Sequence, residues 1–219
     1  LKNLKTDYID LYQVHWPSGS WGGRKVPVEE TMRALNDLKS QGKIRAIGVS
    51  NFSRAELEEA ARFGRIESLQ PPYSLLWRQV EKDALPYCMA NGLTVIAYSS
   101  MAQGILAGRF GAEPRFADGD HRKGHRLFQP DLYPQVLQAV ENLKPIAQRN
   151  GITLSQLALA WVLSHPGVCA IAGARSAAQA AENAGAMKVA LSASDLAEME
   201  AIGRTVTDRL DDNPVQWKF

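Results

Sequence analysis

Short apolar runs alternate with amphipathic segments along the chain. The first run, 8–15, alternates apolar and polar residues and is rich in β-formers, so it predicts a strand. Four further runs predict strands at 44–49, 66–70, 93–98 and 168–172. Because parallel neighbours need a long crossover, strands that alternate with helices predict a parallel sheet built from five βα units.

The helices between these strands have recognisable ends. Apolar residues at helical spacing predict a helix over 28–38, and Ser53 with Glu56 forms a capping box for the next helix. The segment 80–91 is expected to be helical, with Gly92 after it and with Pro86 bending the helix or shifting its start.

The last predicted helix begins at Ser192, which forms an acidic cap with Asp195. Leu196, Met199 and Ile202 are expected to form its inner face. The stretch 110–134 is predicted to be irregular and is rich in Gly, Asp, Arg and His. Loops of this length are usually functional or disordered.

Two architectures fit these elements, an open doubly wound sheet and part of an eight-stranded barrel. A doubly wound dinucleotide domain would carry G-x-G-x-x-G after its first strand, and this motif does not occur in the chain. The G-x-x-x-x-G-K-[ST] phosphate loop is also missing. A complete barrel usually needs about 250 residues and eight strands. Five units therefore fall three strands short of one.

Composition predicts one globular domain over residues 1–219, with 45% hydrophobic and 22% charged residues. The net charge of +2 is spread along the chain and argues against a nucleic-acid partner. The best apolar run, 154–163, is too short to span a membrane. Cys88 and Cys169 lie far apart in apolar surroundings, so we expect two buried thiols and a cytoplasmic location.

Polar residues follow all five predicted strands, at the edge where parallel α/β folds place their chemistry. These residues are His15, Ser50, Asn51, Gln70, Tyr98, Ser99 and Arg175. Each alone has a structural explanation: a satisfied strand-end histidine, a helix cap, a core aromatic or a solvated arginine. The four histidines show no ligand spacing, so no metal site is predicted. A core alone would not select polar residues at five strand ends.

Five blocks in order resemble the aldo-keto reductase family, specifically the C-terminal two thirds of its barrel. They are 7–17, 42–52, Gln70 with 73–76, 97–110, and 173–175 continuing through Gln179 to 182–183. The resemblance implies an α/β fold of the (β/α)8 TIM-barrel type, here incomplete with about five of the eight units. It also implies NADPH-dependent reduction of an aldehyde or ketone to an alcohol.

The same resemblance implies roles for individual residues. His15 would orient the substrate carbonyl; Ser50, Asn51 and Gln70 would bind the nicotinamide carboxamide; and Tyr98, with Ser99 beside it, would stack on the ring. Gln103, Gly104, Leu106 and Gly108 would line the pyrophosphate loop, and Arg175, Gln179 and Asn183 would hold the 2′-phosphate and adenine. The expected cofactor is NADPH/NADP.

The family's proton donor is a tyrosine assisted by a lysine and an aspartate, and all three precede the matched blocks. The resemblance therefore implies that His15 is the one catalytic residue of the family's set in this chain. It also implies that residues 1–219 alone are inactive. Five units cannot close a barrel, so we expect an N-terminal piece to complete it, or self-association to cover the gap.

Two other functions remain open at this point. One is a non-catalytic NADPH-binding module that senses redox state, which the absent proton donor would suit. The other is a complete five-stranded α/β binding domain, although the lack of a glycine-rich phosphate loop counts against it. The expected partner in the leading interpretation is a small carbonyl compound.

Overall fold

The computed structural model describes residues 1–20, 22 and 24–213, which form two compact units. Unit 1 holds Leu1–Pro71 and Val80–Ile96, and unit 2 holds Pro72–Gln79 and the described residues from Ala97 onward.

The sheet of unit 1 is parallel and its strands neighbour one another in sequence order. It contains β1 (Ile9–Val14), β2 (Ile44–Ser50), β3 (Ser68–Gln70) and the first three residues of β4 (Thr94–Ala97). A 3-10 turn, η1 (Lys2–Leu4), precedes it. The alternation of parallel strands with helices confirms the predicted α/β class.

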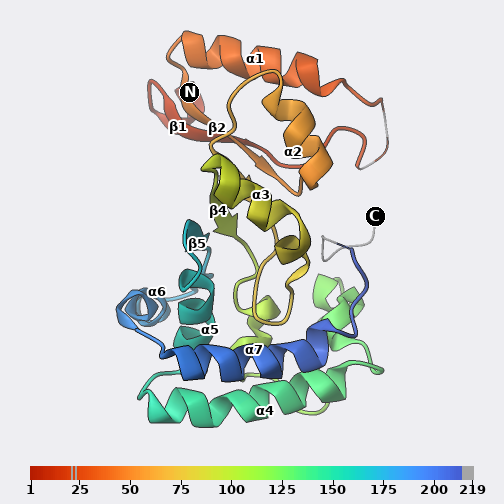
Figure 1. Ribbon diagram of the computed structural model, residues 1–219, viewed down its shortest axis with the longest axis vertical. Coiled ribbons are helices and arrows are strands. Elements are labelled where there is room, and N and C mark those ends of the chain that lie inside the picture. Colours follow the sequence, from red (N-terminus) through yellow and green to blue (C-terminus); the bar gives the residue numbers. More distant parts are fainter. Residues whose placement is uncertain (21, 23, 214–219) are drawn as a thin grey trace. The chain divides into compact units, whose positions relative to one another are not determined.

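Three helices accompany these strands, and Figure 1 shows α1 running beside β1 and β2. They are α1 (Val28–Ser40), α2 (Arg54–Ala61) and α3 (Ala84–Asn91). The capping box of Ser53 and Glu56 is confirmed at the start of α2. Pro86 lies in the first turn of α3, so that helix begins after the 3-10 turn η2 (Gln79–Lys82) and ends at Gly92, whose φ is 66°.

Unit 2 is mostly helical. Its elements are η3 (Ala102–Ala107), η4 (His121–Gly124), η5 (Arg126–Phe128), α4 (Tyr133–Arg149), α5 (Leu154–Leu163), β5 (Val168–Ala170), α6 (Ala177–Gly185), η6 (Ala186–Lys188) and α7 (Ala193–Thr207). Just after β5, the N–H of Ile171 donates to the carbonyl of Ala97 at 2.8 Å. Helices α4 and α7 lie side by side (Figure 1). The predicted irregular stretch is shorter than expected, because 3-10 turns and the start of α4 occupy part of it.

The buried face of α7 differs from the prediction. Met199 is buried as expected, but Leu196 and Ile202 are only half-buried, while Gly203 and Val206 are buried. An ideal Cβ at position 203 would lie 2.7 Å from the carbonyl oxygen of Leu75. The backbone of Leu75 therefore approaches the helix at its glycine and turns that face inward.

The two cysteines also differ from each other. Cys88 is buried, whereas Cys169 is exposed, so the expectation of two buried thiols is wrong for Cys169. Both are free thiols. The apolar surroundings in sequence did not decide burial, because β5 is short and its middle residue faces outward. In the part of the chain that the structure describes, every helix is too short or too polar to cross a bilayer.

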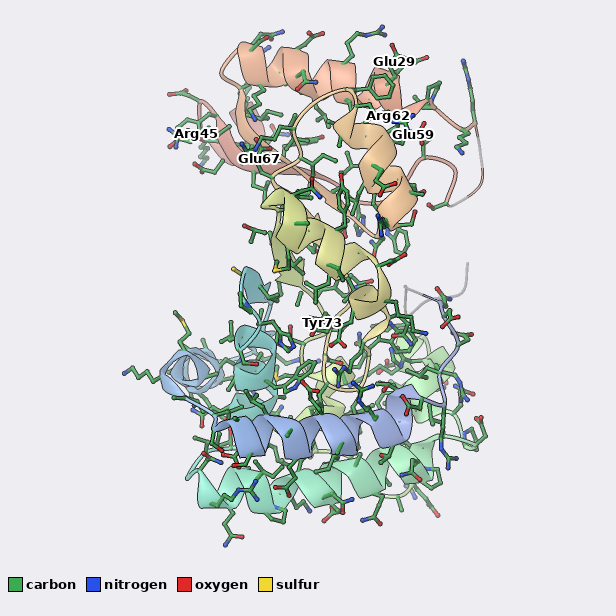
Figure 2. The ribbon with its side chains drawn as sticks, in the orientation of Figure 1. Glu29, Arg45, Glu59, Arg62, Glu67 and Tyr73 are labelled. Carbon is green, nitrogen blue, oxygen red and sulfur yellow. The ribbon has the colours of Figure 1, made fainter. Side chains whose placement is uncertain are left out.

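Glu67, just before β3, joins strands and a helix of unit 1 (Figure 2). One carboxylate oxygen accepts the N–H of Ile47 at 2.7 Å, and the other accepts from Lys39 of α1. The backbone of Glu67 also donates to the Ile47 carbonyl and accepts from Thr94. Because Ile47 is fully buried, the carboxylate is the acceptor on which its N–H depends.

We expect Glu67→Ala to lower the free energy of unfolding by about 1–3 kcal/mol, since a buried N–H loses its acceptor. Glu67→Gln keeps an acceptor oxygen and should cost less. The matched control is Glu58→Ala, which breaks an exposed pair with Arg54 one turn away and should cost about 0.5 kcal/mol or less. Urea unfolding measures all three, and equal losses for Glu67→Ala and Glu58→Ala would contradict the assignment.

Asp195 in the first turn of α7 ties this helix to the end of α4. Its carboxylate accepts from the Arg149 guanidinium at 2.7 Å, from the Ser192 hydroxyl at 2.9 Å and from the Asn150 amide at 3.2 Å. The guanidinium above all, then the two neutral donors, lower the pKa of Asp195 to about 2. The ionised carboxylate is therefore bound more strongly in the folded chain than in the unfolded one.

The lowered pKa of Asp195 predicts that acid reduces the stability of the fold. The stabilisation is complete above the unfolded pKa, about 4, and is lost as the pH falls from there toward 2. Asp195→Asn should therefore lower the Tm at neutral pH and flatten its decline between about pH 5 and pH 2. Thermal scans across this range test the expectation, which an unchanged acid slope would refute.

Candidate functional site

The strand ends of unit 1 gather four of the predicted residues at one edge of the sheet. We call His15, Ser50, Asn51 and Gln70 the strand-end set. His15 follows β1, Ser50 ends β2 and Gln70 ends β3, and the last two are direct neighbours in the sheet.

Hydrogen bonds connect the members of this set. The Ser50 hydroxyl donates to the Gln70 carbonyl at 2.7 Å, and the Asn51 amide donates to the His15 carbonyl at 3.0 Å. The Asn51 amide is also 3.1 Å from the Ser50 hydroxyl oxygen, and its backbone N–H donates to the Gln70 carbonyl at 3.2 Å. Three strand ends are thereby held together by two consecutive residues.

The backbone explains why an asparagine stands in this position. Asn51 has a φ of 61°, in the left-handed region that asparagine enters more readily than most residues. The alternative explanation of Ser50 and Asn51 as a helix cap does not hold, because the cap of α2 is Ser53. Ser50 is buried, while the His15 side chain is exposed. The set thus presents an accessible imidazole beside a firmly bonded amide.

Unit 2 contains a cavity of about 960 Å³. Six of the predicted residues line it: Ser99, Gln103, Gly104, Arg175, Gln179 and Asn183. They come from the turn after β4 and from α6 with the loop before it, segments more than seventy residues apart in sequence.

The turn after β4 has an unusual backbone. Positive φ angles occur at Ser99 (54°), Ala102 (48°), Gln103 (58°) and Gly104 (91°). The Gln103 amide donates to the Ser99 hydroxyl at 2.7 Å and braces the turn. Such conformations cost energy in non-glycine residues and are concentrated at binding sites.

The start of α6 combines a side-chain cap with an adjacent arginine. Ser176 caps the helix, and the N–H of Arg175 donates to the Gln179 side chain at 2.7 Å. The Asn183 amide donates to the Gly173 carbonyl at 3.1 Å and holds the preceding loop. The exposed Arg175 side chain therefore stands at a helix N-terminus, where the backbone dipole also favours negative charge.

Three predicted cofactor residues of unit 2 do not line this cavity. Leu106 is buried in the core, and Gly108 ends η3 with a φ of 68°. Tyr98 is half-buried, its carbonyl accepts from the N–H of Tyr73, and burial raises the pKa of its phenol. Their predicted roles stay predictions.

The cavity has further lining residues that the sequence did not single out. Several of them belong to the irregular stretch, namely Asp118, Asp120, His121 and Arg122. Arg122 binds the Asp120 carboxylate through its Nε at 3.0 and 3.1 Å and holds the pKa of that carboxyl well below its usual range. The only signal for these residues was the length and polar composition of the loop. Among the described residues, no cluster of three His, Cys, Asp or Glu side chains is placed to hold a metal ion.

Comparison with known proteins gives these arrangements a context. The family model described as "Aldo/keto reductase family" matches residues 1–204. The chain is 41% identical over 181 residues to aldo-keto reductase YhdN of Bacillus subtilis, covering 82% of this chain and 53% of that protein. It is 35% identical over 207 residues to an NADH-specific methylglyoxal reductase of Escherichia coli, covering 94% of this chain and 62% of that protein.

Solved structures agree. The glycerol dehydrogenase AKR11B4 from Gluconobacter oxydans superposes with a TM-score of 0.88 at 32% identity, over 96% of this chain and 63% of that chain. An aldo/keto reductase from Klebsiella pneumoniae, solved with NADP and acetate, gives a TM-score of 0.69 at 32% identity, over 100% and 64%. The chain thus spans between one half and two thirds of the length of these proteins, and its fold is of their (β/α)8 barrel type.

Proposed function

Because the chain belongs to the aldo/keto reductase family, we propose that it binds NADPH and serves the reduction of an aldehyde or ketone to an alcohol. The observation that supports this proposal most directly is the cavity of unit 2. Residues predicted from the sequence for the 2′-phosphate and adenine line it together with residues predicted for the pyrophosphate.

The residues of unit 2 suit the adenosine end of the cofactor. Arg175 offers a planar, permanently charged group to a phosphate, and the N-terminus of α6 adds its dipole. Gln103 is bonded within its own turn, and Asn183 of α6 is bonded to the loop before that helix, so both segments need little reordering when a ligand binds.

The residues of unit 1 suit an amide. A nicotinamide carboxamide carries one acceptor oxygen and two N–H donors, and the strand-end set supplies hydroxyl and amide groups of both kinds. NADPH, when bound, supplies a hydride and its electron pair to the carbonyl carbon. The exposed His15 ring is suited to donate a hydrogen bond to the carbonyl oxygen as negative charge develops there.

The names of two relatives suggest a first substrate to test. The Escherichia coli proteins at 35% and 37% identity are both named methylglyoxal reductases. A short 2-oxoaldehyde therefore belongs in any substrate panel for this protein. One of those relatives is named NADH-specific, so NADPH and NADH are both to be compared as cofactors of this protein.

We expect Arg175→Ala to weaken NADPH binding about tenfold to a hundredfold, since a charge-assisted bond to the 2′-phosphate is lost. NADH has no such phosphate, so its affinity should change little. Titration of nicotinamide fluorescence with both cofactors measures the two losses. Exposed Arg204 on α7 offers a matched control as Arg204→Ala, and equal weakening of both cofactors by Arg175→Ala would reject the phosphate role.

The proposal also includes an expectation about turnover. The family's tyrosine, lysine and aspartate have no counterpart by motif within residues 1–219, and lack of a positioned proton donor costs a factor of about 10²–10⁴. Residues 1–219 alone are therefore expected to bind NADPH without measurable carbonyl reduction, followed as loss of nicotinamide absorbance with an aldehyde panel. Robust turnover would show that a donor is present. Tyr12, which is 43% exposed, would then be replaced before the fully buried Tyr73.

A further inference from the structure

Three residues, each two positions before a member of the strand-end set, lie side by side on neighbouring strands of unit 1. Gln13 of β1 is paired with Gly48 of β2, and Gly48 is paired with Ser68 of β3. We call Gln13, Gly48 and Ser68 the crossing layer. All three belong to the same compact unit as the strand-end set.

The crossing layer and the strand-end set are consecutive levels of one sheet face. Residues two positions apart in a strand project from the same face. Each member of the layer stands two positions before a member of the set: Gln13 before His15, Gly48 before Ser50 and Ser68 before Gln70.

Gly48 leaves no room for a side chain in this layer. An ideal Cβ on Gly48 would lie 2.4 Å from the Ser68 hydroxyl oxygen and 2.8 Å from Cγ of Gln13. The φ of Gly48 is outside the left-handed region, so close packing rather than backbone conformation requires the glycine. Across this space the Ser68 hydroxyl donates to the Gln13 side-chain oxygen at 3.4 Å. Side chains from β1 and β3 thus meet directly over β2.

A core selected for stability alone would not need this polar contact. The Ser68 side chain is buried, and burying a hydroxyl costs free energy unless it is bonded. Replacing both partners of a buried hydrogen bond by apolar groups of the same shape can be neutral or even stabilising. What the polar contact adds is a fixed separation of β1 and β3, the strands that lead to His15 and Gln70.

We propose that the crossing layer positions the strand-end set for the nicotinamide carboxamide, so that Gln13, Gly48 and Ser68 are positioning residues of the site. The inference rests on the proposed function and deepens it. A change in the layer alters the spacing of His15, Asn51 and Gln70 without touching the residues of unit 2 that bind the adenosine end.

The test uses two ligands that separate these ends. NADPH carries the nicotinamide, whereas adenosine 2′,5′-bisphosphate carries only the adenine and the 2′-phosphate. Gly48→Ala should raise the Kd for NADPH about tenfold, through loss of about one hydrogen bond to the carboxamide. The Kd for the bisphosphate should stay within about twofold, because the residues proposed to bind it belong to the other compact unit and are far from Gly48 in sequence.

A second variant and a control separate positioning from general damage. Ser68→Ala removes the hydroxyl that donates to Gln13 and leaves Gly48 unchanged, so it should also raise the Kd for NADPH while the Kd for the bisphosphate stays within about twofold. Gly124→Ala is the matched control, since its Cβ would meet no atom within 4 Å, and both Kd values should be unchanged. Equal loss of both ligands in Gly48→Ala, or an unchanged Kd for NADPH in Ser68→Ala, would overturn the proposal.

A readout without ligand keeps this inference apart from the proposed function. The N–H of Asn51 donates to the Gln70 carbonyl, so its hydrogen-exchange rate reports on the spacing of the strand ends. Gly48→Ala should accelerate this exchange about tenfold, and Ser68→Ala should accelerate it in the same direction. If the unmodified protein binds neither ligand, the proposed function fails and the exchange of Asn51 decides the inference. An unchanged rate in Gly48→Ala would reject it.

Discussion

The parallel register of β1, β2 and β3 is the constraint on which unit 1 depends. It places Gln13, Gly48 and Ser68 at one level and Ser50 beside Gln70 at the next. Because side chains alternate between faces, a slip of one residue would exchange this whole face for the other. Glu67 anchors the register at the start of β3 through its bonds to Ile47 on one side and Thr94 on the other.

Unit 2 reaches its binding geometry in a different way, through loops and a helix end rather than through strand alternation. The positive φ angles from Ser99 to Gly104 and the braced start of α6 shape two walls of the cavity. The loop around Asp120 and Arg122 supplies a third. The strained turn is compatible with a stable unit, because other elements supply the packing. The largely buried helix α5 contacts α4, and α4 contacts α7.

The sequence predicted the features that periodicity and capping control. Five strands, the cap at Ser53, the stop at Gly92 and the polar strand ends all follow from short-range patterns. It failed where a tertiary neighbour decides. The backbone of Leu75 meets α7 at Gly203, and Cys169 lies in the middle of β5 on its exposed side. The loop residues Asp118 and Arg122 have no periodic signal, so only their segment could be identified.

The unequal environments of the two cysteines have a practical consequence. Burial raises the pKa of Cys88 to about 12, so this thiol is neutral and shielded near neutral pH. Cys169 is exposed and lies two residues before Ile171, which lines the cavity of unit 2. A maleimide fluorophore would therefore attach at a single native position beside that cavity. The unaltered sequence already contains a reporter site for ligand binding.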